Sequence, residues 1–265
     1  ITETTIAGSI AAANGGGIYS VDDSAITLVN STISGNSAAG DGGGIFIDPN
    51  AARGFDIDFT TIVGNSAVNG GGLATDDTVT TSLSSTILSG NTATTSGSDA
   101  YIDGSSSLTS TYSIFGSAAT VTGATINDDS NIFGDPKLNG LADNGGPTLT
   151  RLPQWDSPVI GAGDPNWSGT PAFDQRGSGF PRDAEGAVSI GAVQGFSPKP
   201  APQPPTPVPP SAPMNVSGTA RDGEATITWS APSSSGSFPV TTYQAVVSPG
   251  GQSCTVASSP CTITG

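Results

Sequence analysis

Four aspartates follow a recurring glycine-rich phrase at similar offsets along the first half of the chain: Asp22, Asp48, Asp76 and Asp103. Carboxylates stacked at one corner could bind calcium, or could supply the acid and base of glycoside hydrolysis. The competing interpretation is structural, because an aspartate in a turn accepts hydrogen bonds from its own backbone. One aspartate per repeat at one turn favours the structural interpretation. We therefore expect no catalytic residue, and calcium is the one cofactor that this column leaves open.

A second column consists of threonines that each directly precede an isoleucine: Thr5, Thr32, Thr61 and Thr86. We expect these side chains to face outward, where a regular hydroxyl ladder could bind glycans or order ice-like water. The alternative is that threonine occurs at these positions because it has a high propensity for solvent-facing β-strands. Because serine and threonine are abundant throughout this chain, the alternative is favoured.

The chain has two cysteines, Cys254 and Cys261, and no histidine. Zinc would need more ligands than these residues supply. A local disulfide is the favoured interpretation over two free thiols, and closing so short a loop contributes roughly 2–3 kcal/mol in the chain-entropy model. A disulfide indicates an oxidising compartment, hence secretion or display on a cell surface.

The formal net charge is −15, although only 11% of the residues are charged. Such acidity argues against nucleic acid and anionic membranes as partners, because both require basic patches. No stretch approaches the ~18 apolar residues of a membrane-spanning helix. The chain starts and stops within repeat and strand patterns, so we expect a piece of a longer protein, and we expect a monomer.

The elements that must position these residues are repeats. Glycine triplets start at Gly15, Gly42 and Gly70, and an asparagine phrase ends at Asn36, Asn65 and Asn91. A period of about 27 residues, rich in β-branched residues and turns, predicts a parallel β-helix over residues 1–136. Like residues should then stack, with asparagines bonding along the stack. The expected inner apolar column is Ile6, Ile33, Ile62, Ile87 and Ile114.

Gly43-Gly44-Ile45-Phe46 and Ile33-x-x-Asn36 resemble the repeats of chlamydial-type polymorphic outer membrane proteins and related bacterial right-handed β-helices. The resemblance covers about half of the chain, with isoleucine where that family favours phenylalanine. It implies an all-β fold, a right-handed pectin-lyase-like solenoid, and a surface-exposed, often adhesive, passenger.

Residues 137–195 close the repeats. Ser157-Pro158-Val159-Ile160, Asp174-Gln175-Arg176-Gly177 and Ile190-Gly191-Ala192-Val193 resemble the bacterial choice-of-anchor Q domain. This resemblance implies export and anchoring at the cell surface, without an activity. Physically, we expect apolar residues to cover the open end of the solenoid, and aspartate and arginine to form a buried tether. The expected covering residues are Leu138, Leu149, Leu152, Trp155, Val159 and Ile160.

Residues 196–212 are rich in proline and predict an extended spacer. From residue 213 to 265 the strand patterns Ala225-Thr226-Ile227-Thr228-Trp229 and Val240-Thr241-Thr242-Tyr243 resemble the first strands of a fibronectin type III domain. The two aromatic residues match the core of that sandwich.

Together these patterns predict a non-catalytic scaffold of adhesin-like function, secreted by a bacterium or held at its surface. Extracellular glycans or surface proteins are the expected partners. The alternatives are a polysaccharide-active β-helix enzyme, either lyase or glycoside hydrolase, and a glycan- or ice-binding module that uses the threonine face. Residues 1–136 contain one basic residue, Arg53, which disfavours the enzyme because an acid–base set would be incomplete.

Overall fold

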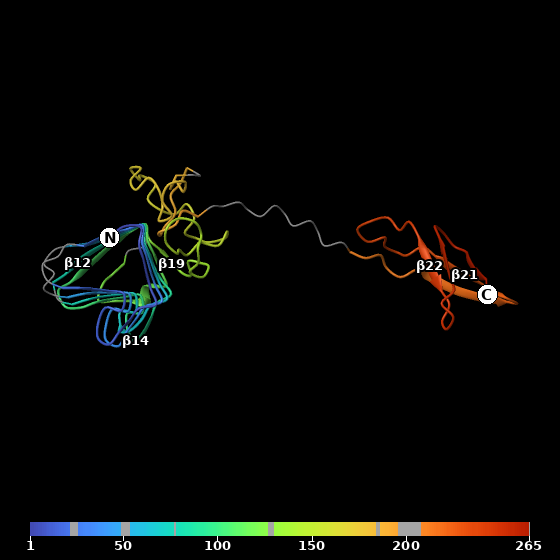
Figure 1. Ribbon diagram of the computed structural model, residues 1–265, viewed down its shortest axis with the longest axis horizontal. Helices are drawn as coiled ribbons and strands as arrows, with labels where there is room; N and C mark the ends of the chain where they lie inside the picture. Colours follow the sequence, from blue (N-terminus) through green and yellow to red (C-terminus); the bar gives the residue numbers. More distant parts are fainter. Residues whose placement is uncertain are drawn as a thin grey trace. The chain divides into compact units, whose positions relative to one another are not determined.

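The computed structural model describes residues 1–21, 26–48, 54–76, 78–126, 130–183, 186–195 and 208–264. Nearly all of its regular structure is β-strand, with one short 3₁₀ helix at Ala118–Thr120. The chain forms two compact units, Ile1–Lys199 and Pro200–Gly265. Figure 1 shows the first unit as nested coils of backbone. The predicted all-β fold is confirmed.

The first four coils of the first unit each pass through four sheets, and every strand pair between coils is parallel. Sheet 1 holds β1 (Thr5–Ala7), β5 (Thr32–Ser34), β9 (Thr61–Val63), β13 (Ile87–Leu88), β17 (Ile114–Phe115) and β19 (Ile132–Phe133). Sheet 2 holds β2 (Ile10–Ala11), β6 (Ser37–Ala38), β10 (Ser66–Asn69) and β14 (Thr92–Ser96).

Sheet 3 holds β3 (Ile18–Ser20), β7 (Ile45–Ile47), β11 (Leu73–Thr75), β15 (Ala100–Ile102) and β18 (Val121–Thr122). Sheet 4 holds β4 (Ile26–Val29), β8 (Phe55–Asp58), β12 (Thr80–Ser84) and β16 (Ser107–Thr111). The architecture is consistent with a right-handed parallel β-helix, which we call the stem.

The core of the stem is a continuous apolar column, because each coil contributes equivalent inward side chains to it. Ile33, Ile62, Leu88 and Phe115 enter from sheet 1, while Leu28, Ile57 and Leu83 enter from sheet 4. Ala124 and Ile126, which follow β18, are partly buried and pack against this core.

The register of sheet 1 corrects the expected inner column. Ile62 pairs with Leu88, and Thr61 pairs with Ile87. Because successive side chains of a strand point to opposite faces, a slip of one residue exchanges inside and outside. Leu88 therefore lies in the core and Ile87 lies on the outer face. Ile114 also lies on the outer face, because it pairs with Ile87 where β17 stacks on β13.

The glycine triplets stack directly on one another, because Gly44 N–H donates to the Gly71 carbonyl and Ile45 N–H donates to the Gly72 carbonyl. A Cβ atom on Gly44 would lie 2.5 Å from the Gly72 carbonyl oxygen. No side chain fits at that separation. The coils approach so closely here that Gly44 cannot be replaced by a residue with a side chain.

Residues 137–183 and 186–195 lie along the side of the stem and outside its coils (Figure 1). We call them the covering segment. Val159 and Ile190 pack on the outward Ile87 and Ile114 of sheet 1. The expectation that this segment covers the open end is wrong, because its contacts run along sheet 1, from Glu3 and Thr5 to Ile114. Of the expected covering residues, Leu149 and Trp155 remain exposed.

The second unit contains two antiparallel sheets. One consists of β20 (Met214–Arg221), β21 (Glu224–Ser230) and β24 (Cys261–Thr264); the other pairs β22 (Tyr243–Val246) with β23 (Ser253–Val256). The rings of Trp229 and Tyr243 contact each other at a centroid distance of 5.2 Å. A cavity of about 510 Å³ lies beside these rings and is lined by Val216 and Ile227.

Candidate functional site

The repeated asparagines form a hydrogen-bonded ladder between coils. Asn36 donates from both its backbone N–H and its side-chain amide to Asn65 Oδ1, each at 3.0 Å. Asn65 donates in the same way to Asn91 Oδ1. The side-chain amides also donate to backbone carbonyls, such as Asn65 Nδ2 to Ile33 at 3.1 Å. The predicted bonding of asparagines along the stack is confirmed.

Asp99 ends this ladder. Its Oδ1 accepts from the backbone and side-chain amides of Asn91, as an asparagine of a further coil would. Its Oδ2 accepts from Gly116 N–H at 2.9 Å and from the Thr120 hydroxyl. Four donors saturate a carboxylate. Asp99 is 0% exposed, and it closes the ladder as a structural acceptor.

Burial raises the pKa of Asp99, because desolvation penalises the charged form more than the four donors favour it. A cavity of about 370 Å³ adjoins it and is also lined by Ser89 and Asp135. A carboxyl with a raised pKa beside a cavity is the usual description of a general acid. Here the oxygens of Asp99 are already occupied by Asn91, Gly116 and Thr120.

The aspartate column follows sheet 3. Asp48, Asp76 and Asp103 come directly after β7, β11 and β15, one per coil, and the backbone N–H of Asp76 donates to the carbonyl of Ile47. Asp103 Oδ1 accepts from Gly104 N–H at 2.8 Å, which is a local turn contact. Asp22 lies outside the described residues. The structure thus brings three of the four predicted residues into one row.

Aromatic residues stand beside this row. Tyr19 stacks on Phe46 with ring centroids 5.4 Å apart, and its hydroxyl donates to Asp48 Oδ2 at 3.0 Å. This hydrogen bond is the main cause of a raised pKa for Tyr19, and the negative charge of Asp103 is the main cause of a raised pKa for Tyr101. In the described parts of the chain, no three His, Cys, Asp or Glu side chains are arranged to hold a metal ion. Calcium binding stays a prediction.

The threonine column does not form an exposed face. Thr32 and Thr61 are 0% and 2% exposed, because the covering segment lies on them. The Thr32 hydroxyl donates to Gln175 Oε1, and Thr61 Oγ1 accepts from Ala192 N–H at 3.0 Å. Thr5 donates to the carbonyl of Leu149. The expectation that this column faces solvent is wrong, because these hydroxyls hold the covering segment to the stem.

Thr86 belongs to a different column from the other three threonines. It is 0% exposed, and its hydroxyl oxygen lies 3.0 Å from the carbonyl oxygens of both Ile57 and Ser84, which share its single proton. It accepts from Thr60 N–H, which places it at a corner between sheets 4 and 1. Ser113 repeats the same turn contact with Thr111 in the next coil. This column stabilises corners by side chain to backbone bonds.

Two arginines of the covering segment are buried. Arg176 forms an ion pair with Asp174 at 2.7 Å, as the predicted tether requires. Arg182 instead donates to Asn30 Oδ1 of the stem and to the carbonyls of Gly191 and Ala192. Its guanidinium lies 4.0 Å from the centre of the Phe59 ring. Burial lowers the pKa of Arg182 to about 9, so it stays charged at neutral pH.

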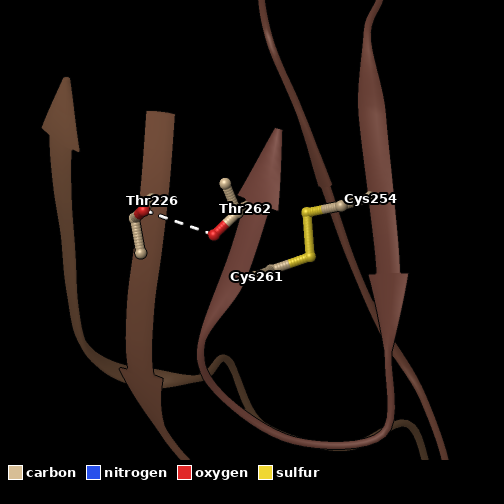
Figure 2. Close-up of a disulfide and its surroundings, with 4 residues drawn as sticks. All are labelled: Thr226, Cys254, Cys261 and Thr262. Carbon is tan, nitrogen blue, oxygen red and sulfur yellow. Dashed lines mark hydrogen bonds between the residues drawn. A yellow bond between two sulfur atoms is a disulfide. The ribbon is translucent and has the colours of Figure 1, made fainter. Parts of the chain in front are cut away.

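Cys254 and Cys261 form the predicted disulfide, with their Cα atoms 6.1 Å apart. Figure 2 shows that it joins β23 to β24 and that the hydroxyls of Thr226 and Thr262 meet on the neighbouring strands. Since β23 and β24 belong to different sheets of the second unit, the bond crosslinks these two sheets.

No protein-family model, curated protein or solved structure matches the chain. Within the described residues, no helix is long and apolar enough to cross a membrane. The role of Asp99 at the end of the ladder was not predicted from the sequence, although one signal was available. The fourth repeat has Gly97-Ser98-Asp99 where earlier repeats have three glycines, and the asparagine column ends in the following coil.

Proposed function

We propose that this chain belongs to a non-catalytic scaffold of adhesin-like function, which a bacterium secretes or holds at its surface. The observation that carries the proposal is how the repeated polar side chains are used. Asn36, Asn65 and Asn91 bond coil to coil, while Thr32 and Thr61 bond the covering segment. These polar side chains hold the coils and the covering segment together, which makes the stem rigid. A rigid stem suits the display of a binding surface better than catalysis.

Two further features support an extracellular location. The Cys254–Cys261 disulfide is stable in oxidising compartments. The motif order of residues 137–195 resembles a segment that follows surface β-helices, and the strands after residue 213 resemble a fibronectin type III module. We propose extracellular glycans or surface proteins as partners of a monomeric stem.

The location is tested on intact cells of the source bacterium with an antibody against the first unit. We expect labelling of unbroken cells or recovery in the medium, and loss of the cell-bound signal after external protease. An antibody against a cytosolic protein serves as the control for lysis. Labelling that requires broken cells would overturn the proposal.

The enzyme alternative is tested by incubating the purified chain with pectate, alginate and xylan, with and without calcium. We expect no reducing ends or unsaturated uronides beyond those of a heat-denatured sample. Product formation that Asp48→Asn or Asp76→Asn abolishes would establish the enzyme instead. The same samples test calcium binding by the aspartate column. If the midpoint of thermal unfolding is the same with calcium and with a chelator, calcium is not a ligand of this column.

A further inference from the structure

The covering segment contains a cavity of about 540 Å³ that none of the repeated columns uses. Its described lining comes from residues 161–169, from Asp183 and from residues 186–188, and it includes Asp164 and Trp167. The volume falls within the range of about 300–1,000 Å³ that is typical of small-molecule sites. We propose that this cavity binds a neutral saccharide of two or three units.

The loops that form the cavity are fixed to each other and to the stem. Gly163 N–H donates to the Val188 carbonyl at 2.8 Å, and Asp164 N–H donates to Ser85 Oγ of the stem at 3.4 Å. A Cβ atom on Gly163 would lie 2.9 Å from Val188 Cγ2 and 3.0 Å from the Val188 carbonyl oxygen, so a larger residue would require Val188 to shift. A cavity between tied loops is preorganised, which reduces the entropy lost on binding.

Trp167 supplies an aromatic wall whose position is set by its own hydrogen bonds. Its indole N–H donates to the Thr170 carbonyl at 2.9 Å, and its backbone N–H donates to the Asp164 carbonyl at 3.1 Å. An anchored indole offers a flat apolar surface at little entropic cost. The C–H face of a pyranose ring is a complementary surface.

Asp164 and Asp183 supply acceptors for hydroxyl groups. Asp164 Oδ1 accepts from Asn166 N–H at 2.8 Å. Hydrogen bonds to a charged acceptor are the stronger kind. An aromatic wall and carboxylates that line the same cavity can together bind the C–H face and the hydroxyl groups of a saccharide. The carboxylates and the net charge of −15 disfavour anionic sugars. A single ammonium group, which the carboxylates would also attract, is too small to fill this volume.

The experiment uses the full chain with Trp155→Phe and Trp229→Phe, which leaves Trp167 as the single tryptophan of the three in the sequence. Its fluorescence is titrated with maltotriose, cellotriose and chitotriose. Trigalacturonate is the anionic comparison, and spermidine is the cationic one. We expect a saturable change with at least one neutral trisaccharide and a dissociation constant of about 1 mM or tighter. Raising the salt concentration should leave that affinity unchanged, because a neutral ligand is not screened.

Substitutions then assign the site by calorimetry in the otherwise natural sequence. Trp167→Ala should weaken binding at least about tenfold, whereas Trp167→Phe should retain part of the affinity because it keeps an aromatic face. Asp183→Asn should weaken it no more than about threefold, since the amide oxygen still accepts from a hydroxyl. Trp155→Ala is the matched control, because this exposed tryptophan lies outside the cavity lining. Hydrogen exchange of residues 161–188 checks that each variant keeps its loops.

Three results would overturn the proposal. The first is the absence of binding by all three neutral trisaccharides at about 10 mM. The second is binding that Trp167→Ala leaves unchanged. The third is binding of spermidine alone, lost with salt and with Asp183→Asn, which would make the cavity a cation site. Because purified protein is used, none of these outcomes depends on where the cell places the chain, so this proposal and the proposed surface role fail separately.

Discussion

Replacing Asn65 with alanine should destabilise the stem more than any exposed polar substitution. The side chain of Asn65 is 0% exposed and makes four hydrogen bonds. Two of these come from Asn36, and the other two go to Asn91 Oδ1 and the Ile33 carbonyl. At about 1 kcal/mol for each bond, the loss is about 4 kcal/mol. The backbone N–H of Asn36 would also be left buried without this acceptor, which moves the expected value toward 5 kcal/mol.

The assay is urea unfolding of the full chain followed by far-ultraviolet circular dichroism, with hydrogen exchange to locate the change. Exchange should accelerate in the strands that flank the ladder, β5, β9 and β13, while the second unit keeps its rates. Thr94→Ala is the matched control, because Thr94 is exposed on β14 of the neighbouring coil. It should change the free energy of unfolding by no more than about 0.5 kcal/mol.

Asn36→Ala provides an internal scale. Asn36 accepts from Ser9 N–H and donates to Asn65 Oδ1 and the Ile6 carbonyl, which is one bond fewer than Asn65 makes. It also lies nearer to the first coil, where the neighbouring Ile6 and Ser9 are only partly buried. We expect a loss of about 2–3 kcal/mol. If Asn65→Ala cost under about 1 kcal/mol, or no more than Thr94→Ala, the ladder would not be what holds the coils in register.

Three other predictions concern single features of the two units. The raised pKa of Asp99 means that the native state holds its proton more tightly than the unfolded state. Its stabilising contribution is therefore present below the ordinary pKa and is lost as pH rises through the raised one. The stability difference between the natural protein and Asp99→Asn should therefore fall as pH rises above about 4 in urea titrations. Gly44→Ala should prevent stable folding, because its Cβ atom would lie 2.5 Å from a backbone carbonyl oxygen. Gly35 has a positive φ, but a Cβ atom there would have no neighbour within 4 Å. Gly35→Ala should therefore lower the free energy of unfolding by only about 1 kcal/mol, measured by thermal unfolding. Reducing Cys254–Cys261 should lower the stability of the second unit by roughly 2–3 kcal/mol and leave exchange in the stem unchanged.

The stacked architecture could be predicted because it repeats. A glycine triplet that returns with a fixed period predicts close contact between coils, and an asparagine that returns with it predicts a ladder. Register was harder, because Ile87 and Leu88 are both apolar and alternation cannot show which one faces inward. An isoleucine column chosen by residue identity therefore crossed from the inner to the outer face between Ile62 and Ile87.

Burial of the outer face could not be predicted from the repeats themselves. Thr32 and Thr61 have the pattern of solvent-facing strand residues, and nothing near them in the sequence indicates a cover. Their partners are Gln175 and Ala192, well over a hundred residues later. Local periodicity describes which side of a strand points out of the coil. Whether that side meets water depends on a segment that shares no period with it.

The asparagine ladder shows why function should be sought where the period breaks. A buried polar side chain that stacks on its own copy from coil to coil must carry both a donor and an acceptor. An asparagine satisfies this condition because its amide carries both donor and acceptor, whereas a buried aspartate would face another negative charge. Asp99 can therefore close the buried ladder but could not be repeated within it, and the aspartates that do repeat, such as Asp48 and Asp76, lie on the less buried rim after sheet 3. Stacking thus restricts such a column to groups that can bond to their own copies, whereas Trp167 in the covering segment does not repeat and is under no such restriction.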